Sequence, residues 1–342
     1  MMFVDLRSDT FTKPCPEMRE WMKNAEVGDD VFAEDPTVNR LQEEVSSLLG
    51  KEAGLFVASG VMGNQVAINA HTQPGEEVIL EQNAHIFYYE AGAPAMLSGV
   101  QLRTVPGENG ILTDAAIEKV IRPYNVHFPP TRLICLENTH NRAGGKIYPL
   151  DEIKKIHNLS KKYGLNMHLD GARLWNASVA TGISLKEYAR YFDSVSVCFS
   201  KGLGAPIGSM IVGSKEFIKK AHRYRKIYGG GMRQAGIIAA GALYAVNNNI
   251  KRLSQDHNNA KKLAEGFNSI TEFSVDMDNV ETNIVMVDID KNYLTADQVA
   301  AKLKKHNILI LSVGPQRLRA VTHLDVDSSD IDTAVDAIKS LF

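Results

Sequence analysis

The chain has 342 residues, of which 44% are hydrophobic and 23% are charged, and its formal net charge is −2 at pH 7. This composition is ordinary for a globular protein with a sizeable core, and the small net charge argues against nucleic acid as a partner. The N-terminus lacks a basic region followed by a long apolar run, so we expect no secretory signal. We expect no membrane partner, because no stretch reaches the roughly 18 apolar residues of a membrane helix.

Short apolar runs alternate with helical patterns through the first two thirds of the chain. The predicted strands are Gly54–Ala58, Val78–Leu80, Gln101–Val105, Leu133–Glu137, Met167–Asp170, Ser194–Phe199 and Met210–Val212. The predicted helices are Val38–Leu49, Thr113–Arg122, Leu150–Tyr163 and Leu185–Tyr191, and Asp35-Pro36 and Thr113-Asp114 are helix start signals. Such alternation predicts an α/β fold with a mostly parallel sheet that is covered on both faces.

The pattern changes after about residue 245. One long helix is predicted over about Gly231–Leu263. It is followed by predicted elements at Ser274–Val275, Ile284–Ile289, Ala296–Lys305, Ile308–Leu311, Leu318–Val321 and Ser329–Leu341. We therefore expect a large α/β domain over residues 1–245, with an N-terminal arm over about 1–30, and a small α+β domain over residues 246–342.

The three cysteines, Cys15, Cys135 and Cys198, lie far apart in the chain. Their spacing predicts neither a disulfide framework nor a metal site. A chain with unpaired cysteines is typical of a reducing compartment, so we expect the protein in the cytoplasm.

A lysine follows directly on one predicted strand and enters a glycine-bearing turn, in Ser196-Val197-Cys198-Phe199-Ser200-Lys201-Gly202. Most lysines are merely solvated. At a strand end, however, a lysine can point into the crevice at the edge of the sheet, where desolvation and neighbouring cations make its neutral amine available as a nucleophile.

An aspartate ends another predicted strand, in Met167-His168-Leu169-Asp170. Such a residue is often a helix N-cap or a turn residue. Held at the carboxyl edge of the sheet, it can instead keep the pyridine nitrogen of pyridoxal 5′-phosphate (PLP) protonated, which makes that ring an electron sink.

Two further candidates follow earlier strands. Ser59, Gly60 and Val61 form a small turn before a helix, where backbone N–H groups can bind an anion, although many β–α turns look the same. His85 follows the strand at Val78–Leu80 and can stack on a flat ring or move a proton. Together, an anion-binding turn, an aspartate and a lysine on successive strand ends favour a PLP enzyme that acts on a small amino acid.

At this point the sequence resembles the low-specificity L-threonine aldolases, within the fold-type I PLP enzymes related to aspartate aminotransferase. The resemblance covers nearly the whole chain. It rests on ordered blocks that include Val4-Asp5-Leu6-Arg7-Ser8-Asp9-Thr10, Glu137-Asn138-Thr139-His140-Asn141, Leu169-Asp170-Gly171-Ala172-Arg173, Ser200-Lys201-Gly202-Leu203, Gly229-Gly230-Gly231-Met232-Arg233-Gln234 and Arg319-Ala320-Val321-Thr322-His323.

The resemblance implies a role for each matching position. Lys201 would form the Schiff base with PLP, Asp170 would pair with the pyridine nitrogen, and His85 would stack on the ring. The residues implied at the phosphate and around the cofactor are Ser59, Gly60, Val61, Arg173, Ser200, Lys226 and Arg233, the last two toward a neighbouring subunit. Those implied at the substrate are Ser8, Arg173 and Arg319 for the carboxylate and His127 for the β-hydroxyl.

The sequence departs from the family pattern at three places. Val61 stands where a threonine is frequent, Phe32 stands where a tyrosine is frequent, and residues 312–316 differ from the usual form. These departures concern the substrate preference, not the cofactor.

The implied reaction is retro-aldol cleavage of a β-hydroxy-α-amino acid, which yields glycine and an aldehyde. His85 and His127 are both candidates for the base that takes the β-hydroxyl proton, directly or through water. Racemisation, β-elimination and transamination on the same fold remain alternatives, and so does a non-catalytic ligand-binding protein. The resemblance further implies a homo-oligomer, either a dimer or a tetramer.

Overall fold

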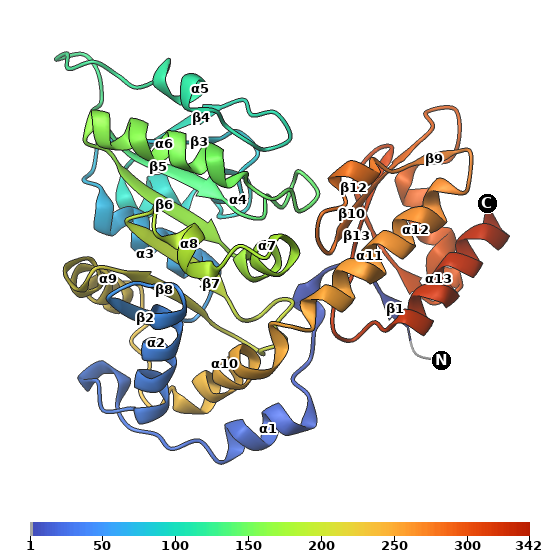
Figure 1. Cartoon of the computed structure of the whole chain (residues 1–342), viewed down its shortest axis with the longest axis horizontal. Helices are drawn as coiled ribbons and strands as arrows, with labels where there is room; N and C mark the ends of the chain where they lie inside the picture. The colour runs from blue at the N-terminus through green and yellow to red at the C-terminus, as the bar shows by residue number, and fades with distance from the viewer. Residues whose placement is uncertain (1–2) are drawn as a thin grey trace.

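A seven-stranded sheet organises the larger part of the protein, and the computed structural model describes residues 3–342 (Figure 1). In spatial order its strands are β2 (Ala53–Val57), β8 (Ser209–Gly213), β7 (Ser194–Cys198), β6 (Asn166–Gly171), β5 (Thr131–Glu137), β3 (Glu77–Glu81) and β4 (Gln101–Val105). Strand β8 is antiparallel to both of its neighbours, and the other neighbouring pairs are parallel. The prediction of seven strands in a mostly parallel sheet is confirmed.

Alternate residues of each strand face opposite sides of this sheet, so each side has its own core. Ile134 and Leu136 of β5 belong to the core under helices α2 (Pro36–Leu48) and α6 (Leu150–Tyr163). Leu133 and Cys135 belong to a second core under helix α3 (Gly60–His71). Helix α9 (Lys215–Ile227) packs beside α3. The sheet is therefore buried on both faces, which explains its nearly continuous apolar strands.

The predicted helices are found, and α2 shows why the start signals are informative. Pro36 is its first residue, and the Asp35 carboxylate accepts a hydrogen bond from the backbone N–H of Val38 at 3.0 Å. Helix α5 is shorter than predicted and ends at Glu118. The remaining helices of the larger part include α1 (Pro16–Lys23), α4 (His85–Tyr88), α5 (Asp114–Glu118), α7 (Leu174–Thr181), α8 (Leu185–Ala189), α10 (Gly236–Asn249), the 3-10 helix η2 (Asp30–Phe32) and the π-helix η3 (Pro94–Ser98).

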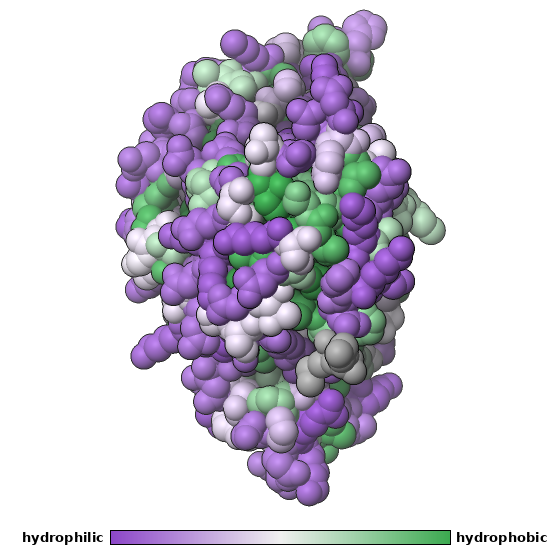
Figure 2. Space-filling model, turned by 90° about the vertical axis from the view of Figure 1, so that its right-hand side faces the viewer, coloured by the Kyte–Doolittle hydropathy of each residue, from purple (hydrophilic) through white to green (hydrophobic). Residues whose placement is uncertain are grey.

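The C-terminal part is a four-stranded antiparallel sheet in the order β12-β13-β10-β9. Its strands are β9 (Phe273–Ser274), β10 (Ile284–Ile289), β12 (Leu311–Gly314) and β13 (Arg317–Val321), and its helices are α11 (Leu253–Asn268), α12 (Ala296–Lys305) and α13 (Ser328–Leu341). Its outer surface is largely hydrophilic, with hydrophobic residues gathered near the middle (Figure 2). Within residues 3–342, every helix falls short of the length and apolar character needed to cross a bilayer.

The prediction of one long helix over 231–263 is wrong. The chain forms α10 and α11 instead, separated by a turn at residues 250–252. The run Asn247-Asn248-Asn249 precedes that turn, and asparagine favours turns and caps over helix interiors. The side chain of Asn249 donates to the carbonyl of Leu203 at 2.7 Å, which ties the end of α10 to the loop after Lys201.

The start of the chain packs with the C-terminal part. Strand β1 (Val4–Asp5) pairs in parallel with β11 (Ile308–Leu309), and Leu6 is buried in the same core as α11–α13 (Figure 1). The 3-10 helix η1 (Asp9–Phe11) then leads back toward the larger sheet, where the hydroxyl of Thr12 donates to the carbonyl of Lys201 at 3.1 Å.

Candidate active site

Adjacent parallel strands end at one edge of the large sheet and gather the polar groups that follow them. Glu137 ends β5 and is the register partner of Asp170 on β6, which is the partner of Ser196 on β7. Asp170 is buried and accepts hydrogen bonds from Asn64 Nδ2 at 2.9 Å and from the backbone N–H of Ala172 at 3.1 Å. Lys201 follows β7 by three residues at the same edge. Asp170 and Lys201 therefore lie at the same edge of the large sheet, as predicted.

The first turn of α3 reaches the same edge. The Ser59 hydroxyl caps the helix by accepting from the N–H of Met62 at 3.1 Å. A Cβ atom at Gly60 would lie 2.8 Å from Cys198 Sγ, so only glycine allows the helix to start this close to the end of β7. Ser59 and Val61 are exposed, and Ser200 is half-buried. The N–H groups of this turn and the helix dipole form a site suited to an anion such as a phosphate.

His85 begins α4 and is held by two buried carboxylates. Its backbone N–H donates to Glu137 at 2.7 Å, and its ring Nδ1 lies 3.0 Å from Glu90 Oε1. Burial on its own would lower the pKa of His85, but the hydrogen bond to Glu90 and the charges of Asp170 and Glu137 outweigh it and raise that pKa. One ring nitrogen of His85 and one carboxylate oxygen each of Glu90 and Asp170 lie within 4.8 Å of one another.

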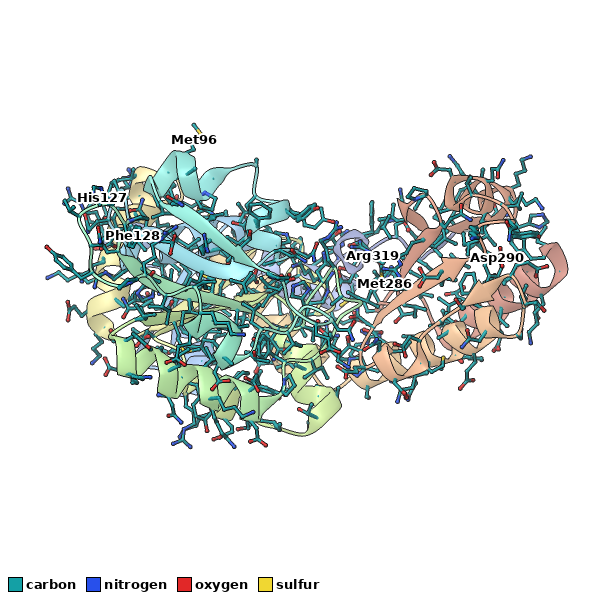
Figure 3. All side chains as sticks on the ribbon, turned by 90° about the horizontal axis from the view of Figure 1, so that it is seen from above. Met96, His127, Phe128, Met286, Asp290 and Arg319 are labelled. Atoms are coloured by element: carbon teal, nitrogen blue, oxygen red, sulfur yellow. The ribbon has the colours of Figure 1, made fainter. Side chains whose placement is uncertain are left out.

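Two guanidinium groups meet at the junction of the two parts of the chain. Arg173 is buried and forms two hydrogen bonds with the carboxylate of Asp9, both at 2.7 Å. Arg173 and Arg319 each donate to Asn141 Oδ1 at 3.3 Å, so they converge on one acceptor. Figure 3 shows Arg319 on the side of the C-terminal sheet that faces the larger part.

The charged groups at this junction favour the binding of an anion. Burial would raise the pKa of Asp9, but Arg173 and Lys201 hold it well below its ordinary range. Burial, and then the neighbouring charge of Arg173, lower the pKa of Arg319. The Nε atom of Arg319 is buried and has no hydrogen-bond partner among the described residues. Because buried donors are rarely left unpaired, this atom indicates a ligand with acceptor oxygens, such as a carboxylate.

Ser8 lies beside this pair. It is buried and caps η1, where its hydroxyl oxygen accepts from the N–H of Thr10 at 3.2 Å and from the Thr10 hydroxyl at 2.8 Å. Its neighbour Asp9 is the partner of Arg173, so the N-terminal segment contributes directly to the junction.

Three predicted residues do not join the others within one chain. His127 is exposed in the loop before β5, near the start of β3, where Phe128 stacks on Arg122 and Arg122 pairs with Glu77 at 2.9 Å. That edge is opposite to the one that carries Lys201, and Figure 3 shows His127 at the end of the larger part that lies away from Arg319 and the C-terminal sheet. Lys226 is exposed at the end of α9, and Arg233 is exposed in an ion pair with Asp29.

Four residues of the site were not singled out from the sequence. They are Asp9, Asn64, Glu90 and Asn141. Asp9 and Asn141 lie inside ordered blocks that were recognised as blocks only. Asn64 lies one turn into the helix that follows the anion-binding turn, and Glu90 lies five residues after His85. The short sequence distance of Asn64 from the turn, and of Glu90 from His85, was the signal that could have identified these two residues.

The chain is similar to known proteins over nearly its whole length. The profile of the family described as "Beta-eliminating lyase" matches residues 5–292. A "Probable low-specificity L-threonine aldolase 2" from Arabidopsis thaliana is 46% identical over 99% of this chain and 97% of its own length. The chain belongs to the low-specificity L-threonine aldolase family. The "Low specificity L-threonine aldolase" of Escherichia coli K12 is 43% identical over 96% of both chains.

Solved structures show the same fold for this threonine aldolase family member. The threonine aldolase of Leishmania major superposes with a TM-score of 0.84 over 99% of both chains, at 22% identity. The predicted fold class, a fold-type I PLP enzyme with a mostly parallel large sheet and a smaller C-terminal sheet, is confirmed.

The cofactor of this family is PLP, and the residues present fit it. An amine, Lys201, and an acceptor carboxylate, Asp170, lie at the same sheet edge as an anion-binding helix start. A half-buried imidazole, His85, lies beside them. This donor set matches the three parts of PLP that a protein must hold: its aldehyde, its ring nitrogen and its phosphate.

Proposed function

We propose that this protein is a PLP-dependent aldolase that cleaves L-threonine and L-allo-threonine to glycine and acetaldehyde. The observation that supports this most strongly is the arginine pair beside Lys201. Arg173 and Arg319 share Asn141, and Arg319 keeps one buried donor for a further acceptor. An amino acid bound through its carboxylate at this pair would present its amine toward the cofactor.

Each side chain has a defined task in this proposal. Lys201 would hold the aldehyde end of PLP through its amine. Asp170 would accept a hydrogen bond from the protonated ring nitrogen, and the first turn of α3 would hold the phosphate. When bound, PLP supplies an electron sink for the electron pair of the broken Cα–Cβ bond.

His85 is the residue of this chain best placed to handle the β-hydroxyl proton. Glu90 fixes its Nδ1 side, which leaves the Nε2 side of the ring for the substrate or for a bridging water. In the same proposal the His85 ring also covers one face of the cofactor.

We further propose that the enzyme is a homo-oligomer, a dimer or a homotetramer, in the cytoplasm. Four exposed hydrophobic residues surround a cavity beside the anion-binding turn, namely Val61, Met96, Leu97 and Ile227. Met96 is 85% exposed and projects away from the protein (Figure 3). A partner on this face would cover the hydrophobic residues. It would also explain how His127, Lys226 and Arg233, which are distant from Lys201 in their own chain, serve a site. Three free cysteines are compatible with a reducing compartment.

The division into a large domain over 1–245, with an arm over about 1–30, and a small domain over 246–342 is part of the same proposal. Residue 245 falls within α10, just before the turn that separates α10 from α11.

The test is to mix the purified protein and PLP with L-threonine or L-allo-threonine and to measure acetaldehyde and glycine. Both isomers should be cleaved, and Lys201→Ala should lower the rate roughly 10³-fold and abolish the cofactor absorption band. Cleavage of one isomer only would retain the aldolase but not its low specificity.

The same assay distinguishes β-elimination, which the description of the family profile makes the second candidate. Elimination from threonine releases ammonia and a 2-oxo acid in place of glycine and acetaldehyde. A protein that forms no cofactor band with added PLP would contradict both candidates.

A further inference from the structure

A second set of buried polar side chains connects Asp170 to the opposite edge of the sheet. Asn64 and His71 are seven residues apart on α3 and therefore share the helix face that packs on β6 and β7. His168 and Asp170 are two residues apart on β6 and share a face of the sheet. Ser194, the first residue of β7, is the register partner of His168.

These side chains form an unbroken series of hydrogen bonds. Asn64 Nδ2 lies 2.9 Å from Asp170, and Asn64 Oδ1 lies 3.1 Å from His168 Nε2. His168 Nδ1 lies 2.8 Å from Ser194 Oγ, which in turn lies 2.7 Å from His71 Nε2. Asn64, His168 and Ser194 are each at most 1% exposed. Polar groups so deeply buried need these partners, so each link depends on the next.

The direction of the series follows from counting donors and acceptors, beginning at Asp170. The amide nitrogen of Asn64 donates to two carboxylates, those of Asp170 and Glu90, so its oxygen must accept. The ring of His168 therefore carries its proton on Nε2. Burial lowers the pKa of His168 to about 4, so at neutral pH the ring is neutral and its Nδ1 must accept.

The remaining two links are then fixed. The single hydroxyl proton of Ser194 is donated to His168, so Ser194 Oγ accepts from His71, which carries its proton on Nε2. Each donor points toward Asp170, from His71 at one end to the Asn64 amide at the other. Such alignment polarises successive hydrogen bonds in the same sense and strengthens the last one.

The far end of the series, His71, is half-buried at the wall of a cavity. His71 stacks on Phe217 at 4.6 Å and lines a cavity of about 570 Å³ with Lys51, Arg190, Asp193 and Lys220. Burial, His168 and Lys220 lower the pKa of His71, and Asp193 opposes them. His71 is thus neutral at pH 7 and lies at the edge of the sheet opposite to Lys201.

The close packing of α3 makes the series possible. A Cβ atom at Gly63 would lie 2.5 Å from Ser196 Oγ, so a larger residue would push the helix away from β7. Its neighbour Asn64 would then lose contact with both Asp170 and His168.

We propose that Asn64, His168, Ser194 and His71 are positioning residues that orient Asp170 and fix it as the acceptor for the ring nitrogen of the cofactor. The proposal rests on the proposed function only for the identity of that cofactor. If the series only fills the core, breaking it should lower the stability of the protein and nothing else. If the series positions Asp170, breaking it at a residue far from the cofactor should also change the affinity of the protein for PLP.

The first experiment interrupts the series at His71, its least buried member, where folding is least at risk. His71→Phe removes the donor, and His71→Gln keeps an N–H donor of similar reach. Apparent Kd for PLP and the absorption maximum of bound PLP are measured for both, with Phe217→Leu as a packing control. We expect His71→Phe to weaken PLP binding about tenfold and to shift the band, the lower end of what outer hydrogen-bond partners contribute at metal sites. His71→Gln and Phe217→Leu should stay near the wild type.

The second experiment reads the protons directly. Nitrogen-15 NMR of the histidine rings in the PLP-free protein should show neutral rings protonated on Nε2 for His71 and His168. In Ser194→Ala the His168 proton should stay on Nε2, where Asn64 accepts it, while the Nδ1 signal should shift because that atom loses its hydrogen-bond donor. Unchanged PLP affinity and absorption in His71→Phe, or a proton on Nδ1 of His168 in the wild type, would overturn the proposal. A wild type that binds no PLP would instead overturn the proposed function.

Discussion

At the scale of single residues, the site depends on neighbouring groups that hold two positively charged arginines close together. Arg173 and Arg319 lie close enough for the charge of Arg173 to lower the pKa of Arg319. Asp9 neutralises one of them through two hydrogen bonds, and Asn141 links both. One net positive charge therefore remains for a carboxylate ligand, and the arginines are already oriented before it binds.

Arg319→Lys tests that arrangement. A lysine keeps the charge but loses the planar group that donates to Asn141 and leaves Nε free. We expect KM for L-threonine to rise about tenfold or more, since a charge-assisted hydrogen bond contributes about 1.5–3 kcal/mol. PLP affinity should not change, and an unaltered KM would remove Arg319 from the carboxylate site.

Glu90→Gln tests the pairing with His85. Loss of the carboxylate should move the pKa of His85 down from its raised value. Because that pKa lies above its ordinary value of 6.5, protonated His85 stabilises the folded protein at lower pH, and this contribution is lost as the pH rises through the raised pKa. NMR titration of the His85 ring should thus give a lower midpoint in Glu90→Gln, while His140, paired with Glu81, keeps its own. Equal midpoints at His85 in both proteins would contradict the pairing.

Side chains at strand ends could be predicted from the sequence. Their hydrogen-bond and ion-pair partners could not. Lys201, Asp170 and His85 each follow or end a strand, so the topology of a parallel sheet brings them together. Glu90 and Asn141 act from loops, and Asp9 comes from the start of the chain. Loop conformation and contacts between distant segments leave no periodic pattern in a sequence, so these partners required the structure.

At the scale of elements, α3 connects the two edges of the large sheet. Its first turn is the proposed anion-binding site, its middle carries Asn64, and its last residue is His71. The helix can do this because Gly63 allows it to lie directly on β7.

Gly63→Ala should therefore destabilise the protein although alanine is the better helix former. The new methyl group would contact Ser196 Oγ, and overpacking costs about 1–3 kcal/mol, of which helix propensity returns up to about 1. Urea unfolding should show this loss, and adding Ser196→Ala should recover part of it, because the two positions touch. Purely additive effects of the two substitutions would show that they do not share this contact.

Elements with a strong period were predicted well, and breaks within helical patterns were not. The strands of the large sheet are apolar because both faces are buried, and each was found within a few residues. The turn between α10 and α11 was missed because apolar periodicity continues across it, while the interruption comes from the Asn247–Asn249 run and its tie to Leu203.

At the scale of the whole molecule, the hydrophobic face beside the anion-binding turn should be the contact between subunits. A double variant, Met96→Glu with Ile227→Glu, places two charges where a partner would bury them. We expect the mass in solution to fall toward that of a single chain and cleavage of L-threonine to fall with it. Met277→Glu, at another exposed methionine, is the matched control. An oligomer that survives the double variant would place the interface on another face.

The pairing of β1 with β11 has a consequence for biosynthesis. Val4 bonds to Asn307 through the backbone, 303 residues later, since 307 − 4 = 303. During translation the N-terminal strand leaves the ribosome first, yet its partner is made almost last. Ser8 and Asp9, which follow that strand, can therefore take their places beside Arg173 only when nearly the whole chain has been synthesised. A nascent chain interrupted before residue 309 would have the large sheet and Lys201 but lack Arg319 and the strand that anchors its own beginning.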